Sequence, residues 1–290
     1  MNLKEIYSDN KQPVISFEVF PPKDNDENLL SEIEILKKHN PAFISLTCGA
    51  GGKENKSFDL LKKIKGVDLM PHFTCITSTR QSVEEGLLEI ENMGIENILA
   101  LRGDIPETPE LRRHDFNYAN ELVSFIKERT NLSIGVAGYP EGHIESPDLK
   151  IDIENLKRKV DAGADVIFTQ LFFDNDKFYD FTERIRNAGI ELPIAAGIMP
   201  VISRKQVERM VSMANVTIPD ELKKAMEKYD SLKEFGIDFA TKQCEDLIKN
   251  EVKGLHFFTL NKSYSTTKIL TGVNYGIEQT HWTHIVKTGR

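Results

Sequence analysis

The stretch VISFEVFPPK, residues 14–23, predicts a short strand that carries one carboxylate and stops at two prolines. Side chains alternate between the two faces of a strand, so Ile15, Phe17 and Val19 share one face. Glu18 lies on the other face. If the strand belongs to a parallel sheet covered by helices, the apolar face packs against those helices and Glu18 points away from them. A solvated edge strand is the alternative for a lone glutamate.

Seven further segments rich in apolar and β-branched residues predict strands along the rest of the chain. Together with Val14–Phe20, the strands are Ala42–Thr47, Met70–Ile76, Asn97–Leu101, Leu132–Ala137, Asp165–Leu171, Pro193–Ala196 and Leu255–Leu260. The first seven begin roughly 30 residues apart, which is the length of one strand, one helix and two short loops. Eight such units predict an α/β fold of the closed (β/α)8 TIM barrel type.

Charge-rich helical segments separate these strands. The clearest are Asp24–His39, Ser82–Met93, Asn117–Thr130, Pro147–Ala162 and Asp176–Ala188. A longer insert, Ser203–Lys253, lies between the last two strands and predicts two or three helices, with Pro219 opening the middle one. No linker or change of composition divides the chain, so residues 1–290 are expected to form one catalytic barrel domain with a helical insert between strands seven and eight.

The composition is that of an ordinary globular chain, with 40% hydrophobic and 28% charged residues. Its 45 acidic and 37 basic side chains give a net charge of −8, which argues against a nucleic-acid or anionic membrane surface. Cys48, Cys75 and Cys244 are widely spaced and match neither a zinc site nor a disulfide framework, so no metal is expected. Without a signal-peptide pattern or a membrane-length apolar run, a cytoplasmic location is expected.

Polar residues gather where the predicted strands end. They are Thr47, Cys48 and Gly49, then His72 and Thr74, then Arg102, Gly103 and Asp104, then Tyr139 and His143, and finally Gln170. The carboxyl ends of barrel strands meet at one mouth, so these residues and Glu18 are expected to become neighbours. Any one of them alone is more often structural or solvated than functional.

One predicted helix carries a polar face made of Asp152, Asn155, Arg158 and Lys159, at positions i, i+3, i+6 and i+7. Such a face is most often simply solvated. The functional alternative is that Arg158 and Lys159 neutralise a diphosphate while Asp152 binds a ribose hydroxyl. The chain has no G-x-G-x-x-G and no G-x-x-x-x-G-K-S/T motif, so neither a Rossmann nor a P-loop nucleotide site is supported.

Taken together and in order, the motifs of the chain resemble those of methylenetetrahydrofolate reductases. They are SFEVFPPK, SLTCGAGG, HFTC, ALRGD, AGYPEGH, the helix with the polar face, TQLFFD, GIMPV and LHFFTLN, and they span nearly the whole chain. The resemblance is to the short bacterial form. It implies a (β/α)8 barrel that holds FAD at its mouth and takes hydride from NADH or NADPH. It also implies a ping-pong reduction of 5,10-methylenetetrahydrofolate to 5-methyltetrahydrofolate by a homo-oligomer.

The resemblance also implies roles for individual residues. Glu18 corresponds to the general acid that protonates N10 of the folate, which requires a carboxyl whose pKa burial has raised. Asp104 corresponds to a carboxylate beside the flavin and the folate. Glu18, Gln170 and Lys262 correspond to substrate contacts. The positions that line FAD correspond to Thr47, Cys48, Ala50, His72, Arg102, Gly103, Asp104, Ala137, Tyr139, His143, Asp152, Asn155, Arg158 and Lys159.

The chain departs from the family pattern at three places, and two other functions are kept open. Cys48 stands where other members carry tyrosine, Lys262 where many carry arginine, and Val201–Arg204 holds no aromatic residue where some place a phenylalanine. Lysine lacks the planar fork that pairs with a carboxylate through two bonds. One alternative is a related barrel reductase that receives electrons from a partner protein. Another is a barrel that binds a folate or nucleotide without turnover.

Overall fold

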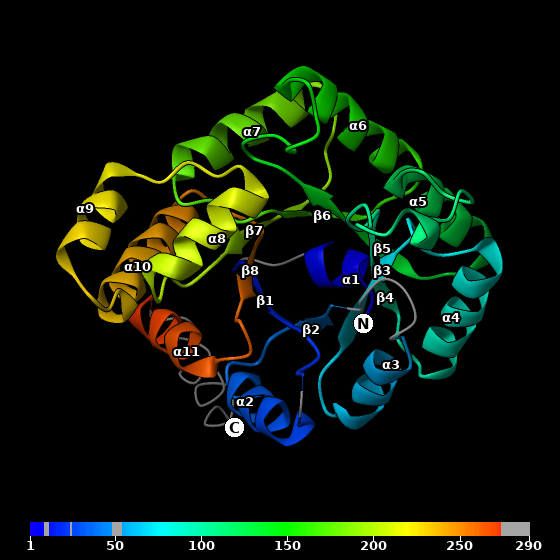
Figure 1. The fold of residues 1–290 in the computed structure, drawn as a ribbon, viewed down its shortest axis with the longest axis horizontal. Helices are drawn as coiled ribbons and strands as arrows, with labels where there is room; N and C mark the ends of the chain where they lie inside the picture. Colours follow the sequence, from blue (N-terminus) through cyan, green and yellow to red (C-terminus); the bar gives the residue numbers. More distant parts are fainter. Residues whose placement is uncertain (9–11, 24, 48–53, 274–290) are drawn as a thin grey trace, which may run out of the picture.

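The computed structural model describes residues 1–8, 12–23, 25–47 and 54–273. Its centre is a closed barrel of parallel strands in sequential order, ringed by helices (Figure 1). The strands are β1 (Val14–Val19), β2 (Phe43–Leu46), β3 (Leu69–Thr74), β4 (Asn97–Leu101), β5 (Ser133–Gly138), β6 (Val166–Thr169), β7 (Ile194–Ile198) and β8 (Gly254–Phe258). The predicted (β/α)8 barrel is therefore confirmed, with each strand within three residues of its expected bounds.

One helix precedes the first strand, and the others follow the strands around the outside (Figure 1). The helices are α1 (Leu3–Ser8), α2 (Asp26–Lys37), α3 (Glu54–Lys63), α4 (Arg80–Asn92), α5 (Ala119–Arg129), α6 (Leu149–Asp161), α7 (Asn175–Asn187), α8 (Arg204–Ala214), α9 (Asp220–Lys228), α10 (Lys233–Lys249) and α11 (Ser263–Gly272). The expected insert between β7 and β8 consists of α8, α9 and α10, and Pro219 is the N-cap of α9. Apolar spacing alone did not predict α1, α3 or α11.

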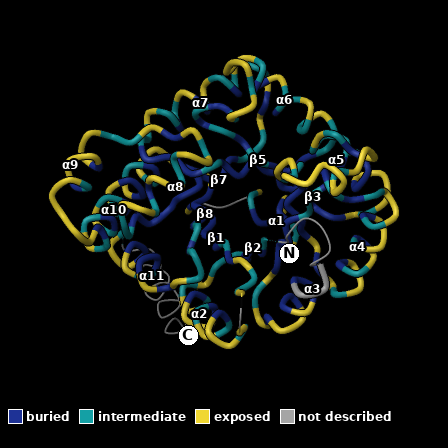
Figure 2. Tube along the Cα trace, viewed as in Figure 1, coloured by how far each residue is buried: buried dark blue, intermediate teal, exposed yellow. Residues whose placement is uncertain are grey.

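Side chains alternate along β1, and its apolar face packs against the helices as predicted. Ile15, Phe17 and Val19 belong to the large core cluster that also holds Leu29 and Ile33 of α2. The same arrangement recurs around the barrel, so the strands are buried and the helices expose their outer faces (Figure 2). Packing between strands and helices therefore turns the remaining face of β1, with Glu18, toward the interior of the barrel.

Helix α1 closes the amino end of the barrel. Leu3 and Ile6 pack against the inward residues of several strands, among them Phe43 and Met70. The Asn97 side chain accepts the Leu3 N–H at 2.7 Å and fixes the helix to β4. This apolar plug leaves the carboxyl ends of the strands as the open end of the barrel.

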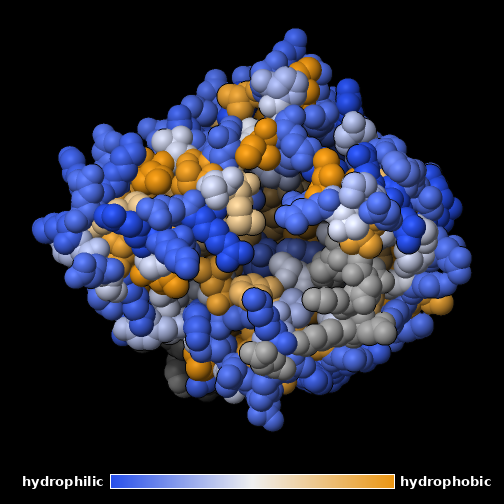
Figure 3. Space-filling model, in the orientation of Figure 1, coloured by the Kyte–Doolittle hydropathy of each residue, from blue (hydrophilic) through white to orange (hydrophobic). Residues whose placement is uncertain are grey.

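The surface of the molecule is mostly hydrophilic, and the face shown in Figure 3 is hollowed near its centre. Within the described part of the chain, no helix combines the length and apolar character needed to cross a membrane.

Candidate active site

Glu18 lies in a polar layer inside the barrel. Its Oε2 is 3.4 Å from Nε2 of His72 on β3 and 3.6 Å from Nε2 of His256 on β8. Ser16 and His256 are register partners on β1 and β8, and the Ser16 hydroxyl is hydrogen-bonded to His256 Nδ1 at 2.8 Å. Strand β1 is paired on both sides, and the Glu18 side chain is only 19% exposed. The alternative of a glutamate on a solvated edge strand is therefore wrong.

The electrostatic setting of Glu18 differs from the one expected. Burial is the largest influence and acts to raise its pKa, but the charge of His72, the hydrogen bond with His256 and the charge of His256 act together in the opposite direction. The pKa of Glu18 is therefore lowered, and the expectation of a raised pKa is wrong. Burial in turn lowers the pKa of His72, whose Nε2 has no hydrogen-bond partner among the described residues.

A cavity of about 430 Å³ lies beside β4, β5 and α6 at the carboxyl ends of the strands. Many of the residues expected at the cofactor line it. They are Arg102, Ala137, Tyr139, His143, Asp152, Asn155, Arg158 and Lys159. The polar face of α6 is thus turned at least partly into a cavity, although the Arg158 side chain remains exposed.

The acidic and basic groups on the α6 face have different partners. Asp152 is buried, and its Oδ1 accepts hydrogen bonds from the His143 N–H at 3.2 Å and the Ser146 hydroxyl at 2.9 Å. Lys159 donates to the carbonyl oxygen of Ala137 at 2.5 Å, and burial lowers its pKa to about 8. A partly buried ammonium whose hydrogen-bond acceptor is a neutral carbonyl can gain a strong partner from an anionic ligand.

The Arg102-Gly103-Asp104 loop continues from β4. Gly103 has φ +83 and its Cα packs near the Thr74 side chain, so a side chain there would be both strained and crowded. Arg102 forms an ion pair with Glu145, and both residues line the cavity. Asp104 is exposed and is not among the residues that line the cavity. The structure therefore places Asp104 next to the cavity but not in its wall.

The remaining predicted site residues lie around the same end of the barrel. Thr47 directly follows β2, and Gln170 directly follows β6, where its Oε1 accepts the N–H of the next residue at 2.9 Å. Lys262 is the exposed N-cap residue of α11. Cys48 and Ala50 lie outside the described residues, so their predicted cofactor contacts stay predictions.

The segment Val201–Arg204 leads from β7 into α8. Val201 is buried among the residues of α8, α9 and α10, and Arg204 donates to the Met226 carbonyl oxygen on α9. Among the described residues, no group of three or more histidine, cysteine, aspartate or glutamate side chains is arranged to hold a metal ion.

Sequence reasoning missed two residues of the site. His256 is a polar residue within the apolar strand LHFF, which was a usable signal, but its contact with Glu18 depends on pairing between the first and last strands. Glu145 follows His143 by two residues in the loop before α6, and no periodic pattern marks it. Both positions depend on closure of the barrel and on loop conformation.

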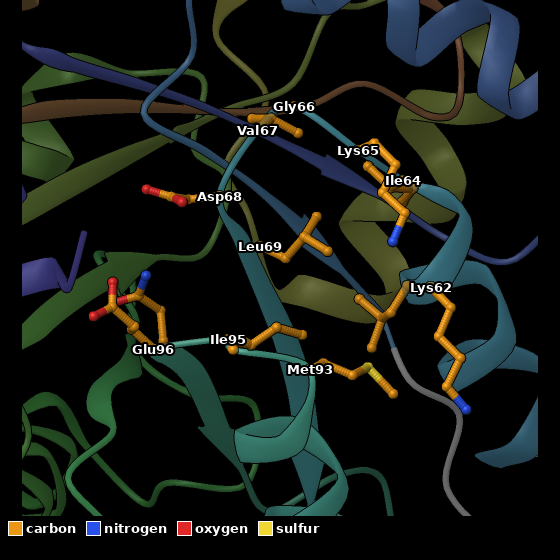
Figure 4. Close-up of a pocket in the computed structure, with 13 residues that line it drawn as sticks. Lys62, Ile64, Lys65, Gly66, Val67, Asp68, Leu69, Met93, Ile95 and Glu96 are labelled. Atoms are coloured by element: carbon orange, nitrogen blue, oxygen red, sulfur yellow. The ribbon is translucent and has the colours of Figure 1, made fainter.

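A second cavity, of about 270 Å³, lies at the amino ends of β3 and β4 (Figure 4). Asp68 and Glu96 stand on one side of it, and Lys62 and Lys65 on the other. The amino group of Met1 pairs with Asp68 at 3.0 Å and with Glu96 at 2.6 Å. This cavity is at the opposite end of the barrel from Glu18 and shares no lining residue with the first cavity.

Solved structures share the fold. A protein from Clostridium thermocellum, described as binding two copies of 5-methyl-5,6,7,8-tetrahydrofolic acid, superposes with a TM-score of 0.66. The alignment covers 96% of this chain and 99% of that one, at 13% identity. At this identity the similarity shows the fold alone.

Comparison with sequences of known proteins identifies the family. A 5,10-methylenetetrahydrofolate reductase of Pectobacterium carotovorum is 38% identical over 259 residues, covering 86% of each chain, and one of Salmonella typhimurium is 38% identical over 262 residues at the same coverage. Methylenetetrahydrofolate reductase (NADH) 1 of Arabidopsis thaliana is 37% identical over 92% of this chain and 49% of its own length. The family model for methylenetetrahydrofolate reductase matches residues 3–274, and the chain therefore belongs to the methylenetetrahydrofolate reductase family.

Proposed function

We propose that this chain reduces 5,10-methylenetetrahydrofolate to 5-methyltetrahydrofolate, with hydride from NADH or NADPH passed through FAD in a ping-pong cycle. The observation that carries the proposal is the position of Glu18. In a chain of this family, Glu18 is a carboxylate held inside the open end of the barrel, with two imidazoles at 3.4 and 3.6 Å. The bacterial relatives that match over 86% of their length carry the name of this activity.

The chemistry of the cavity fits FAD. The cofactor, when bound, carries hydride from the nicotinamide coenzyme to the folate. Lys159 offers an ammonium with a neutral hydrogen-bond acceptor, and Arg158 donates to the side-chain oxygen of Asn155 at 3.2 Å. Both cations can therefore turn to a diphosphate without breaking an ion pair. Asp152 already accepts two hydrogen bonds through Oδ1, which leaves Oδ2 for a ribose hydroxyl.

Glu18 supplies the proton that opens the five-membered ring of the substrate. The ring must lose its N10–carbon bond before hydride can add, and a carboxylic acid that protonates N10 makes the amine a leaving group. The pKa of Glu18 is lowered, so the carboxyl must gain a proton before it can act as an acid. A ligand that covers the mouth strengthens the burial that already acts to raise this pKa.

Other residues at the mouth bind and orient the substrates. Asp104 lies on an exposed loop beside the cavity and can stabilise positive charge on the iminium that forms when the ring opens. Gln170 offers an amide to the pterin, and Lys262 offers a cation to the glutamate tail of the folate. The proposed FAD contacts at the mouth also include Thr47, His72 and Gly103.

An anaerobic visible spectrum of the purified chain tests the proposal. We expect a flavin band, either present on purification or formed with added FAD, that bleaches with NADH or NADPH and returns when methylenetetrahydrofolate is added. A flavin band that neither coenzyme bleaches would overturn direct reduction of the flavin by NADH or NADPH. It would instead indicate that the flavin receives electrons from a partner protein. Absence of a flavin complex even with excess FAD would overturn the proposal that FAD is the cofactor.

A further inference from the structure

An ion pair joins two loops that line the proposed cofactor cavity. Arg102, which follows β4, donates through Nη1 and Nη2 to the two carboxylate oxygens of Glu145, at 2.5 and 2.7 Å. Glu145 belongs to the loop between β5 and α6, and both side chains line the cavity. A guanidinium and a carboxylate that meet through two parallel hydrogen bonds form the strongest and most directional of the common ion pairs. The pair therefore ties the β4 loop to the β5 loop over one side of the cavity.

Both partners are held in place by further contacts. The Glu145 N–H donates to His143 Nδ1 at 3.1 Å, and burial lowers the pKa of His143, so that nitrogen stays unprotonated at neutral pH. The His143 ring packs edge-on against Tyr139, with ring centroids 4.7 Å apart. Arg102 donates through Nε to the Gly103 carbonyl oxygen at 3.1 Å. The hydrogen bond from Arg102 lowers the pKa of Glu145, so the pair is fully charged at neutral pH.

The two residues differ in their freedom to move. The Arg102 side chain is 19% exposed, whereas the Glu145 side chain is 47% exposed. Glu145 is therefore the less tightly packed partner of the pair. The other cations of the cavity, Lys159 and Arg158, donate to neutral oxygens and need no opening of an ion pair.

We infer that Glu145 is a positioning residue that closes the cofactor cavity through Arg102 and sets the rate at which the flavin exchanges. This rests on the proposed binding of FAD in the cavity. On this inference the pair is the same before and after the cofactor binds and opens only during exchange, so its free energy cancels from the dissociation constant and appears in the barrier to both entry and release. Loss of the Glu145 charge thus accelerates both steps by about tenfold, the scale expected of one charge-assisted pair that is partly exposed.

The test compares Glu145→Gln with the unmodified chain and with a matched control. Glu145→Gln keeps the shape of the side chain and removes its charge. Asp161→Asn is the control, because Asp161 pairs with Lys157 on α6 at 2.9 Å and neither residue lines the cavity. Flavin association with the deflavinated full-length chain is followed by stopped-flow fluorescence, and release is followed after dilution of the complex. Circular dichroism checks that each variant is folded.

We expect Glu145→Gln to raise the association and release rates together by about tenfold and to leave Kd within about threefold, while Asp161→Asn changes neither rate. Added salt should speed exchange in the unmodified chain and have much less effect in Glu145→Gln, because salt screens the same ion pair. Unchanged rates would overturn the inference.

Two other patterns would overturn it as well. Tighter binding in Glu145→Gln would show that the carboxylate competes with the cofactor for Arg102. Faster release with unchanged association would show that Glu145 only stabilises the loaded form. If the unmodified chain binds no FAD at all, the proposed function fails. If it binds FAD and Glu145→Gln exchanges the flavin at the same rates, only the role of Glu145 is refuted.

Discussion

Nε2 of His72 lies 3.4 Å from Oε2 of Glu18, within an ion-pair distance but without a hydrogen bond to it. His256 approaches the same oxygen at 3.6 Å from the other side of β1. A carboxylate between two imidazoles is stabilised whenever either ring is charged, which lowers its pKa despite burial. The proposed mechanism therefore requires this carboxyl to gain a proton before it can act as a general acid.

Glu18→Gln should separate the two halves of the proposed reaction. The amide keeps the size of the side chain but has no proton to give, so folate reduction should fall by roughly a hundredfold or more. Oxidation of NADH with an artificial acceptor should continue, because that half-reaction needs no proton on N10. Separate steady-state assays with each acceptor measure the two activities.

The matched control for that experiment is Glu34→Gln, which alters an exposed glutamate on α2 that pairs with Lys37. It should leave both activities unchanged. Folate reduction at the unmodified rate in Glu18→Gln would remove Glu18 from its proposed role.

His72→Gln should raise the pKa of Glu18. The substitution removes one of the two charges that lower this pKa, while the burial that raises it remains. Carbon NMR titration of the Glu18 carboxyl measures the change, with Glu18→Gln used to assign the signal. His39→Gln is the control, because His39 is hydrogen-bonded to Thr267 outside the barrel. A Glu18 pKa that stays constant or falls in His72→Gln would contradict this electrostatic account.

Much of the barrel follows from local patterns in the sequence. The spacing of the apolar segments predicts the number and order of the strands, and period-two alternation predicts that Glu18 faces away from the helices. Helical spacing brings Asp152, Asn155, Arg158 and Lys159 to one face of α6, and all four line the cavity. These properties depend only on neighbours along the chain.

What the sequence could not predict depends on contacts between distant segments. The direction of the Glu18 pKa shift is set by distances to His72 and His256, which lie on two other strands. The Arg102–Glu145 pair depends on the conformations of two loops, for which no periodic pattern exists. The plug formed by α1 was missed because a six-residue helix carries too little apolar periodicity to be distinguished from a loop.

Gly236→Ala should destabilise the helical insert. Gly236 lies on α10, and a Cβ atom there would overlap the carbonyl oxygen of Val201, which is backbone and cannot rotate away. Overpacking of this kind costs about 1–3 kcal/mol of the free energy of unfolding. Thermal and denaturant unfolding of the purified chain measure the change.

Glu245→Ala on the same helix is the matched control, since Glu245 is exposed and its replacement should change stability by less than about 0.5 kcal/mol. A Gly236→Ala variant as stable as Glu245→Ala would show that α10 can shift away from the loop after β7 without cost.

The pH dependence of flavin binding should report on Lys159, whose pKa burial lowers to about 8. A bound diphosphate favours the charged ammonium, so binding takes up a proton when the pH exceeds 8. Affinity should therefore be nearly constant from pH 6.5 to 7.5 and fall by up to about tenfold per unit above pH 8. Fluorescence titrations between pH 6.5 and 9.5 measure Kd.

Lys159→Met should bind flavin more weakly at pH 7 and lose this pH dependence. Lys157→Met alters a lysine of α6 outside the cavity lining and should keep the pH profile of the unmodified chain.

The stability of the protein without flavin provides a second readout. Because the folded pKa lies below the unfolded value of 10.5, the unfolded chain binds more protons between these pH values, and this group makes the free energy of unfolding rise with pH from about 8 to 10.5. A flavin affinity that stays level to pH 9.5 in the unmodified chain would show that Lys159 is not the cation that meets the cofactor.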